Sequence, residues 1–194
     1  MTWRQTAIAL GVLIVVGVVA RTIPHIPNFA PLGATALFCG VYMNRRISII
    51  APIAMMAASD YALLYINPYG SSDFSQLYAP TSIWHNALLY VYGSLAISVV
   101  VGWLIAKERS AGLVVAGALF CSVQFFLITN AAVWIEGAYD RGINGLWQSY
   151  VAGLPFYRGT LLGDLFYTSA FFGLFELARR ARRETAGEVA QPVS

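Results

Sequence analysis

Six polar side chains interrupt or border apolar runs in this 194-residue sequence. They are His25, Asn28, Asp60, Asn130, Arg158 and Asp164. Carboxylates accept hydrogen bonds or balance a cation, a guanidinium pairs with an anion, and an amide both donates and accepts. Such a set suits reversible binding of a small polar solute. Asp60 and Asp164 lie within apolar stretches, where a charged side chain is costly unless it faces a cavity or a partner.

The two aspartates leave two interpretations open. In the first, Asp60 and Asp164 line one polar cavity, and Arg158 pairs with Asp164 or holds an anionic group. In the second, the aspartates pair with Arg158 or Arg21 and only hold helices together. The two interpretations are compatible, because one ion pair can do both.

Motifs for catalysis and for metal or nucleotide binding are missing. The sequence has no GxxxxGK[ST] phosphate loop, no HExxH or GxSxG motif and no Cys/His cluster with metal-ligand spacing. Cys39 and Cys121 lie within apolar stretches and are expected to be small packing residues. His25 and His85 fall in predicted outer loops, where two lone histidines are more often hydrogen-bonding residues than metal ligands. We therefore predict a protein that is not an enzyme and has no cofactor, metal or ATP site.

The composition indicates that the chain is solvated largely by lipid. Apolar residues make up 58% of the sequence and charged residues 11%, whereas a soluble domain carries about 25% charged residues. So few charges could not cover a water-facing surface. The Lys and Arg residues lie in short groups at the ends of apolar segments, which is typical of orientation signals in membrane proteins rather than of nucleic-acid binding.

The apolar segments predict an all-α integral membrane protein with six transmembrane helices. A helix needs about 20 apolar residues to cross a hydrocarbon core of about 30 Å. The predicted spans cover about 5–22, 30–43, 47–66, 86–106, 111–134 and 159–179. The mixed segment 143–157 is expected to form a short interfacial helix before the last span. Residues 1–183 then form a single transmembrane domain, and 184–194 form a disordered cytoplasmic tail.

The distribution of basic residues predicts that both termini are cytoplasmic. With the N-terminus inside, nine of the twelve Lys and Arg residues fall on the inner side, and Arg21, Arg141 and Arg158 fall on the outer side. In this orientation nearly all the costly polar side chains lie in the outer half of the membrane.

The segment 21–31, "RTIPHIPNFAP", is expected to form a stiff outer turn. Its prolines would end the first span and start the second, since proline is tolerated in the first turn of a helix. His25 and Asn28 would then lie on a rigid turn and close the polar cavity from above. The aromatic-rich loop 67–85 has no Lys or Arg and could stack on a planar ligand.

The inner half carries small residues at helix-packing spacing. Ala7 and Gly11 are four positions apart in the first span, and Gly33, Ala36 and Gly40 share one face of the second. Small residues let helices approach closely. These faces are expected either to pack within the bundle or to dock onto another membrane subunit.

Four blocks of the sequence resemble a known family. The blocks are "RTIPHIPNFAPLGATALFCGVYMNRR", "AMMAASD", "FFLITNAAVW" and "GLPFYRGTLLGDLFYTSAFFGLFEL". Over most of residues 21–177 they are similar to small bacterial membrane proteins grouped as a domain of unknown function. That family is similar in size and six-span layout to the S components of energy-coupling-factor (ECF) vitamin transporters. S components bind vitamins or their precursors in an outward-facing pocket and dock onto a transmembrane coupling subunit driven by separate ATPases.

The resemblance implies a bacterial cytoplasmic (inner) membrane location, a ligand at the outer polar cluster and a docking face at Ala7 and Gly11. We therefore predict a substrate-binding membrane protein for uptake of a small nutrient, such as a vitamin or a cofactor precursor. Its binding residues would be the six polar side chains named first. Its partners would be the substrate, the lipid bilayer and a coupling subunit with ATPases, and not nucleic acid. The alternative is a non-catalytic structural or accessory subunit of a larger membrane complex, in which the outer cluster is only an internal lock.

Overall fold

The structure, a computed structural model, describes residues 2–69 and 88–189, with side chains up to residue 185. Most of the predicted aromatic loop at 67–85, including His85, and the first two residues of the predicted fourth span lie outside the described residues. Residues 190–194 of the predicted tail lie outside them as well.

Every regular element in the described ranges is an α-helix. In chain order the helices are α1 (Trp3–Thr22), α2 (Leu32–Tyr42), α3 (Arg45–Leu63), α5 (Leu88–Ile105), α6 (Ala111–Ile135) and α7 (Ile143–Val189). Five of them are long and apolar enough to cross a membrane, whereas α2 is a shorter apolar helix. Large apolar side chains such as Leu89, Leu104 and Phe166 point outward, as expected of a surface that faces lipid. An all-helical protein with several candidate membrane spans is therefore confirmed, while six spans and the cytoplasmic termini stay predictions.

Local side-chain caps explain where three of the helices begin. Thr2 and Gln5 form a reciprocal capping box at the start of α1. The Asn44 side chain accepts the Ile47 N–H at the start of α3, and Ser110 does the same for α6. These caps satisfy backbone N–H groups that have no partner within the helix. At α2 the cap position is Pro31, which offers no side-chain hydrogen bond, so the first turn of α2 must find its partner elsewhere.

The last helix differs from the prediction, because the expected interfacial helix at 143–157 is not separate. It runs without a break into the last span, through Pro155, and α7 continues to Val189 in the predicted tail. The physical reason is that its first half already packs on α6. Ser149 Oγ donates to the Asn130 carbonyl oxygen at 2.7 Å, and the Tyr150 hydroxyl donates to the Leu127 carbonyl oxygen at 3.1 Å. These contacts align residues 143–157 with the rest of the α6–α7 hairpin.

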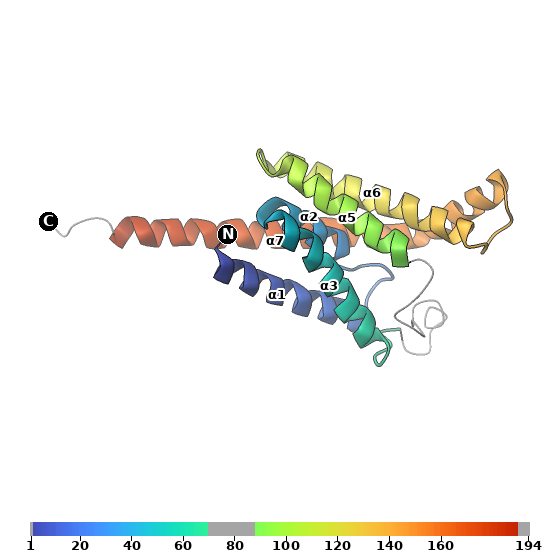
Figure 1. Ribbon diagram of the computed structural model, residues 1–194, viewed down its shortest axis with the longest axis horizontal. Helices are drawn as coiled ribbons and strands as arrows, with labels where there is room; N and C mark the ends of the chain where they lie inside the picture. Colours follow the sequence, from blue (N-terminus) through green and yellow to red (C-terminus); the bar gives the residue numbers. More distant parts are fainter. Residues whose placement is uncertain (1, 70–87, 190–194) are drawn as a thin grey trace.

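The short helix α2 is the centre of the bundle. Figure 1 shows α1 and α3 on one side of the long α7 and α5 with α6 on the other, and α2 contacts α3, α5, α6 and α7. All of its residues from Ala34 to Val41 are buried. Because no face of α2 is free, its ends are fixed by the helices around it, which matters for the candidate site at its N-terminus.

Helices α2 and α5 touch at two glycines. A Cβ atom on Gly40 would collide with the Val99 carbonyl, and one on Gly102 would collide with the Leu37 carbonyl. Ala36 belongs to the same packed cluster as Val99. Two of the three small residues predicted on one face of the second span therefore pack against α5, while Gly33 packs against α7.

The variant Gly102→Ala is expected to lower thermal stability, because its methyl group meets backbone that cannot rotate away. Overpacking of this kind costs about 1–3 kcal/mol. Gly93→Ala, on the same helix, is the matched control: its Cβ would meet nothing within 4 Å, so the better helix propensity of alanine should leave stability equal or slightly raised. Thermal unfolding in detergent followed by circular dichroism measures both. Equal midpoints for the two variants would contradict the close α2–α5 contact.

Candidate functional site

A cavity of about 100 Å³ lies where the turn after α1 meets the start of α2, the end of α3 and the middle of α7. Its polar lining residues are Arg21, His25, Asn28, Tyr69, Thr160 and Asp164. The rest of the lining is mostly apolar and includes Leu63 and Phe125. Three of the six predicted binding residues, His25, Asn28 and Asp164, therefore border one cavity.

The turn between α1 and α2 is held in one conformation by its backbone. Asn28 adopts φ 63°, a left-handed conformation that asparagine tolerates better than most residues. The Phe29 N–H donates to the Ile26 carbonyl and the Ala30 N–H to the Asn28 carbonyl, both at 2.9 Å. These bonds agree with the predicted stiff turn. They also indicate that Asn28 has a structural role, because its left-handed backbone conformation shapes the turn.

Two glycines of α7 bring this turn against the helix. A Cβ on Gly159 would collide with the Pro27 carbonyl, and one on Gly163 would press on the Ala30 backbone at 3.0 Å. The spacing of four positions places both glycines on one face of α7. The segment "GTLLG" has the spacing that is typical of such a contact, but its two glycines were not among the predicted packing residues.

Both ring nitrogens of His25 are engaged. Nδ1 lies 2.7 Å from the Ile23 carbonyl oxygen, and Nε2 lies 3.1 Å from the Tyr69 hydroxyl. Burial raises the pKa of the Tyr69 phenol, against the opposing effect of Arg21. The phenol therefore keeps its proton at neutral pH and can donate it to Nε2 while Nδ1–H donates to the carbonyl. His25 thus ties the turn to the segment after α3.

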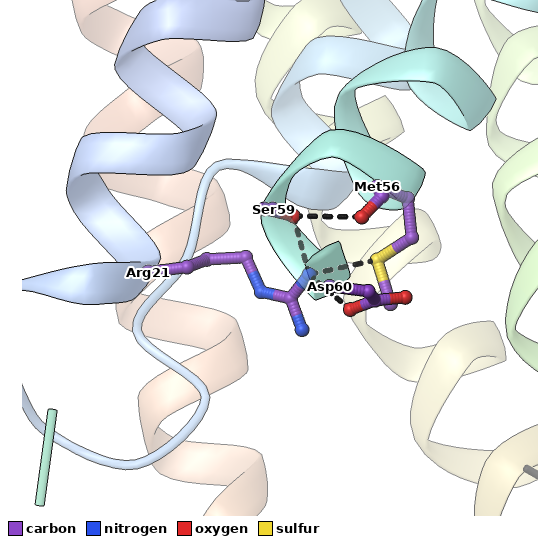
Figure 2. Close-up of polar contacts among 4 residues, drawn as sticks. All are labelled: Arg21, Met56, Ser59 and Asp60. Atoms are coloured by element: carbon purple, nitrogen blue, oxygen red, sulfur yellow. Dashed lines mark hydrogen bonds and ion pairs between the residues drawn. The ribbon is translucent and has the colours of Figure 1, made fainter. Parts of the chain in front are cut away.

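Arg21 and Asp60 form a buried ion pair between α1 and α3 (Figure 2). Arg21 Nη1 donates to Asp60 Oδ1 at 2.7 Å, to Ser59 Oγ and to Met56 Sδ at 3.2 Å. The Asp60 side chain is 4% exposed, and its Oδ2 has no partner among the described residues. Asp60 does not border the cavity but holds the guanidinium that does. One pairing foreseen by the second interpretation, Asp60 with Arg21, is present.

All three of these contacts use the same guanidinium nitrogen. Nη2 and Nε–H have no hydrogen-bond partner within the part of the chain that the structure describes, and Arg21 borders the cavity. Arg21 was not among the predicted binding residues, although it stands at the start of the segment that the sequence analysis singled out.

Asp164 of α7 caps the N-terminus of α2. Its Oδ1 accepts the Ala34 N–H at 3.2 Å, and its Oδ2 accepts the Ser122 hydroxyl at 2.7 Å. The residue is only 3% exposed. Gly33 has no room for a Cβ, which would collide with the carboxyl group. The partner that Pro31 does not supply to α2 therefore comes from another helix.

Asn130 and Arg158 lie apart from the cavity. Asn130 Nδ2 donates to the Phe126 carbonyl of its own helix at 2.8 Å, and its side chain lies against Gly153 of α7. Arg158 is exposed and does not approach Asp164 in an ion pair. The two residues are about one and two-thirds turns apart on a continuous helix, so they project from different faces. Three of the six predicted residues therefore border the cavity. Asp60 contacts it only indirectly, through its ion pair with Arg21, and Asn130 and Arg158 lie away from it.

The model of one protein family matches residues 1–186. The chain belongs to that family, a family of unknown function (DUF6580). No curated protein and no solved structure matches the chain. The expected membership of a domain of unknown function is confirmed, and the further likeness of DUF6580 to ECF S components stays a prediction.

The cavity of this DUF6580 chain is lined by one guanidinium group, from Arg21, and one carboxyl group, from Asp164, together with polar groups of the turn, Tyr69 and Thr160. Its volume of about 100 Å³ is smaller than the roughly 150 Å³ of an engineered apolar cavity that binds benzene. It therefore fits a group of a few heavy atoms. Residues 2–69 and 88–189 hold no group of three or more His, Cys, Asp or Glu that could bind a metal. Nη2 and Nε–H of Arg21, which have no partner among residues 2–69 and 88–189, match a carboxylate or a similar small anionic group.

Proposed function

We propose that the protein is a substrate-binding membrane protein for uptake of a small nutrient, such as a vitamin or a cofactor precursor. The cavity at Arg21 would hold the nutrient's anionic group. The observation that carries the proposal is the position of Arg21. It borders the cavity, while its partners Ser59 and Asp60 occupy only Nη1.

The electrostatics of the ion pair support an anionic group. Asp60 orients the guanidinium in an apolar bundle, where charge-assisted hydrogen bonds are stronger than in water. A ligand carboxylate could accept from Nη2 and Nε–H in the bidentate geometry that arginine favours. His25 and Asn28 would then contact the same ligand from the turn above.

Transport energy must come from outside this chain, because its sequence has no ATP-binding motif. A transmembrane coupling subunit with ATPases would dock at Ala7 and Gly11. Both residues are exposed on α1, and a Cβ added at Gly11 would meet nothing within 4 Å. In the predicted orientation the cavity lies near the outer face of the bacterial inner membrane and the docking face lies nearer the cytoplasm.

The variant Arg21→Lys is expected to weaken binding of small carboxylates about tenfold while the fold is retained. A lysine ammonium can still pair with Asp60, but it cannot offer the second pair of donors. The measurement is ligand-induced thermal stabilisation in detergent, with a panel of aliphatic and heteroaromatic carboxylates and the matching amides. Arg158→Lys is the matched control, because Arg158 is exposed and lies away from the cavity.

Two results would overturn the proposal. In one, no carboxylate of the panel stabilises the wild-type protein more than its amide does. In the other, Arg21→Lys responds as strongly as the wild type and the Arg158→Lys control. Native mass spectrometry of gently extracted protein adds a direct test, because a nutrient retained from the cell would appear as a discrete mass increase.

A structural or accessory subunit of a larger complex is the second candidate. It is favoured by the internal engagement of the other polar groups: Asp60 pairs with Arg21, Asp164 caps α2, and His25 bonds to Tyr69. A membrane partner that co-purifies at a fixed stoichiometry, together with no bound small molecule, would support this function instead.

A further inference from the structure

A second, larger cavity lies at the opposite end of the bundle. It is a groove of about 620 Å³ between the first half of α1, the end of α2 and the last part of α7. Its wall is mainly apolar. The main apolar residues of the wall are Val12, Leu13, Phe38, Phe171, Leu174 and Phe175. Nothing in the candidate site or the proposed function uses this groove.

Three arginines lie at one end of the groove, Arg109 after α5 and Arg179 and Arg182 on α7. Arg109 stands over the Tyr42 ring, 5.4 Å from its centroid. Arg179 donates to Glu176 Oε1 at 2.9 Å. Arg182 is exposed and has no ion pair with the described residues.

The charge at this end of the groove remains positive after its internal pairing. Glu176 is the acidic residue within this group, and it accepts hydrogen bonds from both Arg179 and the Tyr42 hydroxyl, the latter at 2.8 Å. Three guanidinium groups against this one carboxylate leave an excess of about two positive charges. Glu108 precedes Arg109 in the chain but does not line the groove.

The arrangement matches the two parts of a phospholipid. Between Phe171 and Arg182 the helix rises about 16 Å, so an apolar wall of that length ends in a cluster of cations. Arginines near the end of a membrane-spanning helix lie at headgroup level, and basic pockets between helices attract anionic headgroups. A transmembrane helix of another protein fits less well, because the small residues Ala7 and Gly11 lie outside the groove lining.

We infer that the groove between α1, α2 and α7 binds an anionic phospholipid. The phosphate lies against Arg109, Arg179 and Arg182, and an acyl chain lies along the apolar wall formed by α1 and α7. A zwitterionic lipid fills the same wall but gains less from the excess positive charge. The site therefore prefers anionic lipid and depends on both its charge and its groove.

The test is native mass spectrometry of the full chain in detergent micelles titrated with phosphatidylglycerol or with phosphatidylcholine of the same acyl chains. The wild-type protein should retain phosphatidylglycerol at lower lipid concentration than phosphatidylcholine. The double variant Arg109→Gln/Arg182→Gln should weaken phosphatidylglycerol retention by about fivefold for each arginine lost. The matched control is Arg180→Gln/Arg183→Gln, which removes the same charge from exposed positions of α7 outside the groove.

A further variant tests the apolar wall separately. Val12 is 54% exposed and lines the groove, so Val12→Trp should fill the groove without disturbing the core and should weaken retention of both lipids. Glycerol 3-phosphate, a headgroup without chains, should not displace the bound lipid.

Four results would overturn the inference. They are equal retention of the two lipids by the wild type, equal losses in the two arginine double variants, unchanged retention in Val12→Trp, and a membrane polypeptide bound in place of lipid.

Discussion

Replacing Arg21 with leucine is expected to destabilise the protein severely, because the substitution leaves the Asp60 carboxylate buried without its counter-charge. Asp60 Oδ1 accepts a hydrogen bond from Arg21 Nη1 at 2.7 Å, and Asp60 Oδ2 already lacks a partner among the described residues. Removing one member of a buried ion pair costs about 3–5 kcal/mol. In an apolar bundle no water replaces the lost donor. The apparent melting temperature in detergent should therefore fall sharply, or the protein should fail to fold.

The double variant Arg21→Leu/Asp60→Leu separates the loss of a partner from the loss of the pair. Replacing both members of a buried pair with apolar residues is often neutral, so the double variant should recover much of the stability lost in Arg21→Leu. Asp60→Leu alone should be less damaging than Arg21→Leu, since Arg21 is 15% exposed and can reach the cavity. Thermal unfolding of all four proteins in one detergent completes the cycle. If the double variant is no more stable than Arg21→Leu, the unpaired Asp60 carboxylate is not the cause of the lost stability.

Hydropathy was sufficient to predict five long apolar helices, because the requirement for about 20 apolar residues is local in the sequence. The predicted second span contains the 11-residue helix α2, which is shorter than that requirement. The break expected before the last span depended on the mixed composition of 143–157. It does not occur, because Ser149 and Tyr150 bond to α6, and such contacts between helices leave no mark on composition. Propensity and hydropathy describe one segment at a time, whereas continuity of α7 is decided by its neighbour.

The candidate site shows the same division. The side of the membrane predicted for His25, Asn28 and Asp164 was enough to gather them at one end, and the structure places them around one cavity. The hydrogen-bond and ion-pair partners of these side chains were harder to predict from the sequence. Arg158 was a plausible partner for Asp164 by sequence proximity, yet helical geometry alone places the two on different faces once α7 is continuous.

The cap of α2 could not have been predicted from local sequence. A capping residue normally lies next to its helix, but here Asp164 is 130 positions from Ala34. The only local indication in the sequence is the absence of a capping residue, since "APLG" begins a helix without Ser, Thr, Asp or Asn at the cap position. A helix that begins without a cap inside an apolar bundle implies a distant acceptor, and a buried carboxylate is the acceptor that backbone N–H groups favour.

The variant Asp164→Ala is accordingly expected to destabilise the first turn of α2. It removes the acceptor of the Ala34 N–H and of the Ser122 hydroxyl, both buried. The Ala34 N–H is left without this acceptor, which costs about 1–3 kcal/mol. The Ser122 hydroxyl can still donate to the Ala118 carbonyl oxygen at 3.1 Å. Ser122→Ala should cost less than Asp164→Ala, because it removes the hydroxyl that donates to Oδ2 or to the Ala118 carbonyl oxygen but leaves the cap in place. Asp164→Asn should also cost less, since the amide oxygen still accepts the Ala34 N–H.

Hydrogen–deuterium exchange separates this structural function of Asp164 from direct contact with a ligand. If Asp164 acts as the cap, backbone amides at the start of α2, from Gly33 to Ala36, should exchange faster in Asp164→Ala with no ligand present. Amides in the middle of α5 should keep their protection in a sample that remains folded. Unchanged exchange at α2, combined with weaker carboxylate binding, would instead assign the carboxyl group to the ligand. Because α2 is packed on four helices, loosening its first turn should also widen the cavity that Gly33 and Asp164 line. Ligand binding and amide exchange are therefore expected to change together in Asp164→Ala. In Asp164→Asn, which keeps the cap, the two measurements are expected to change independently.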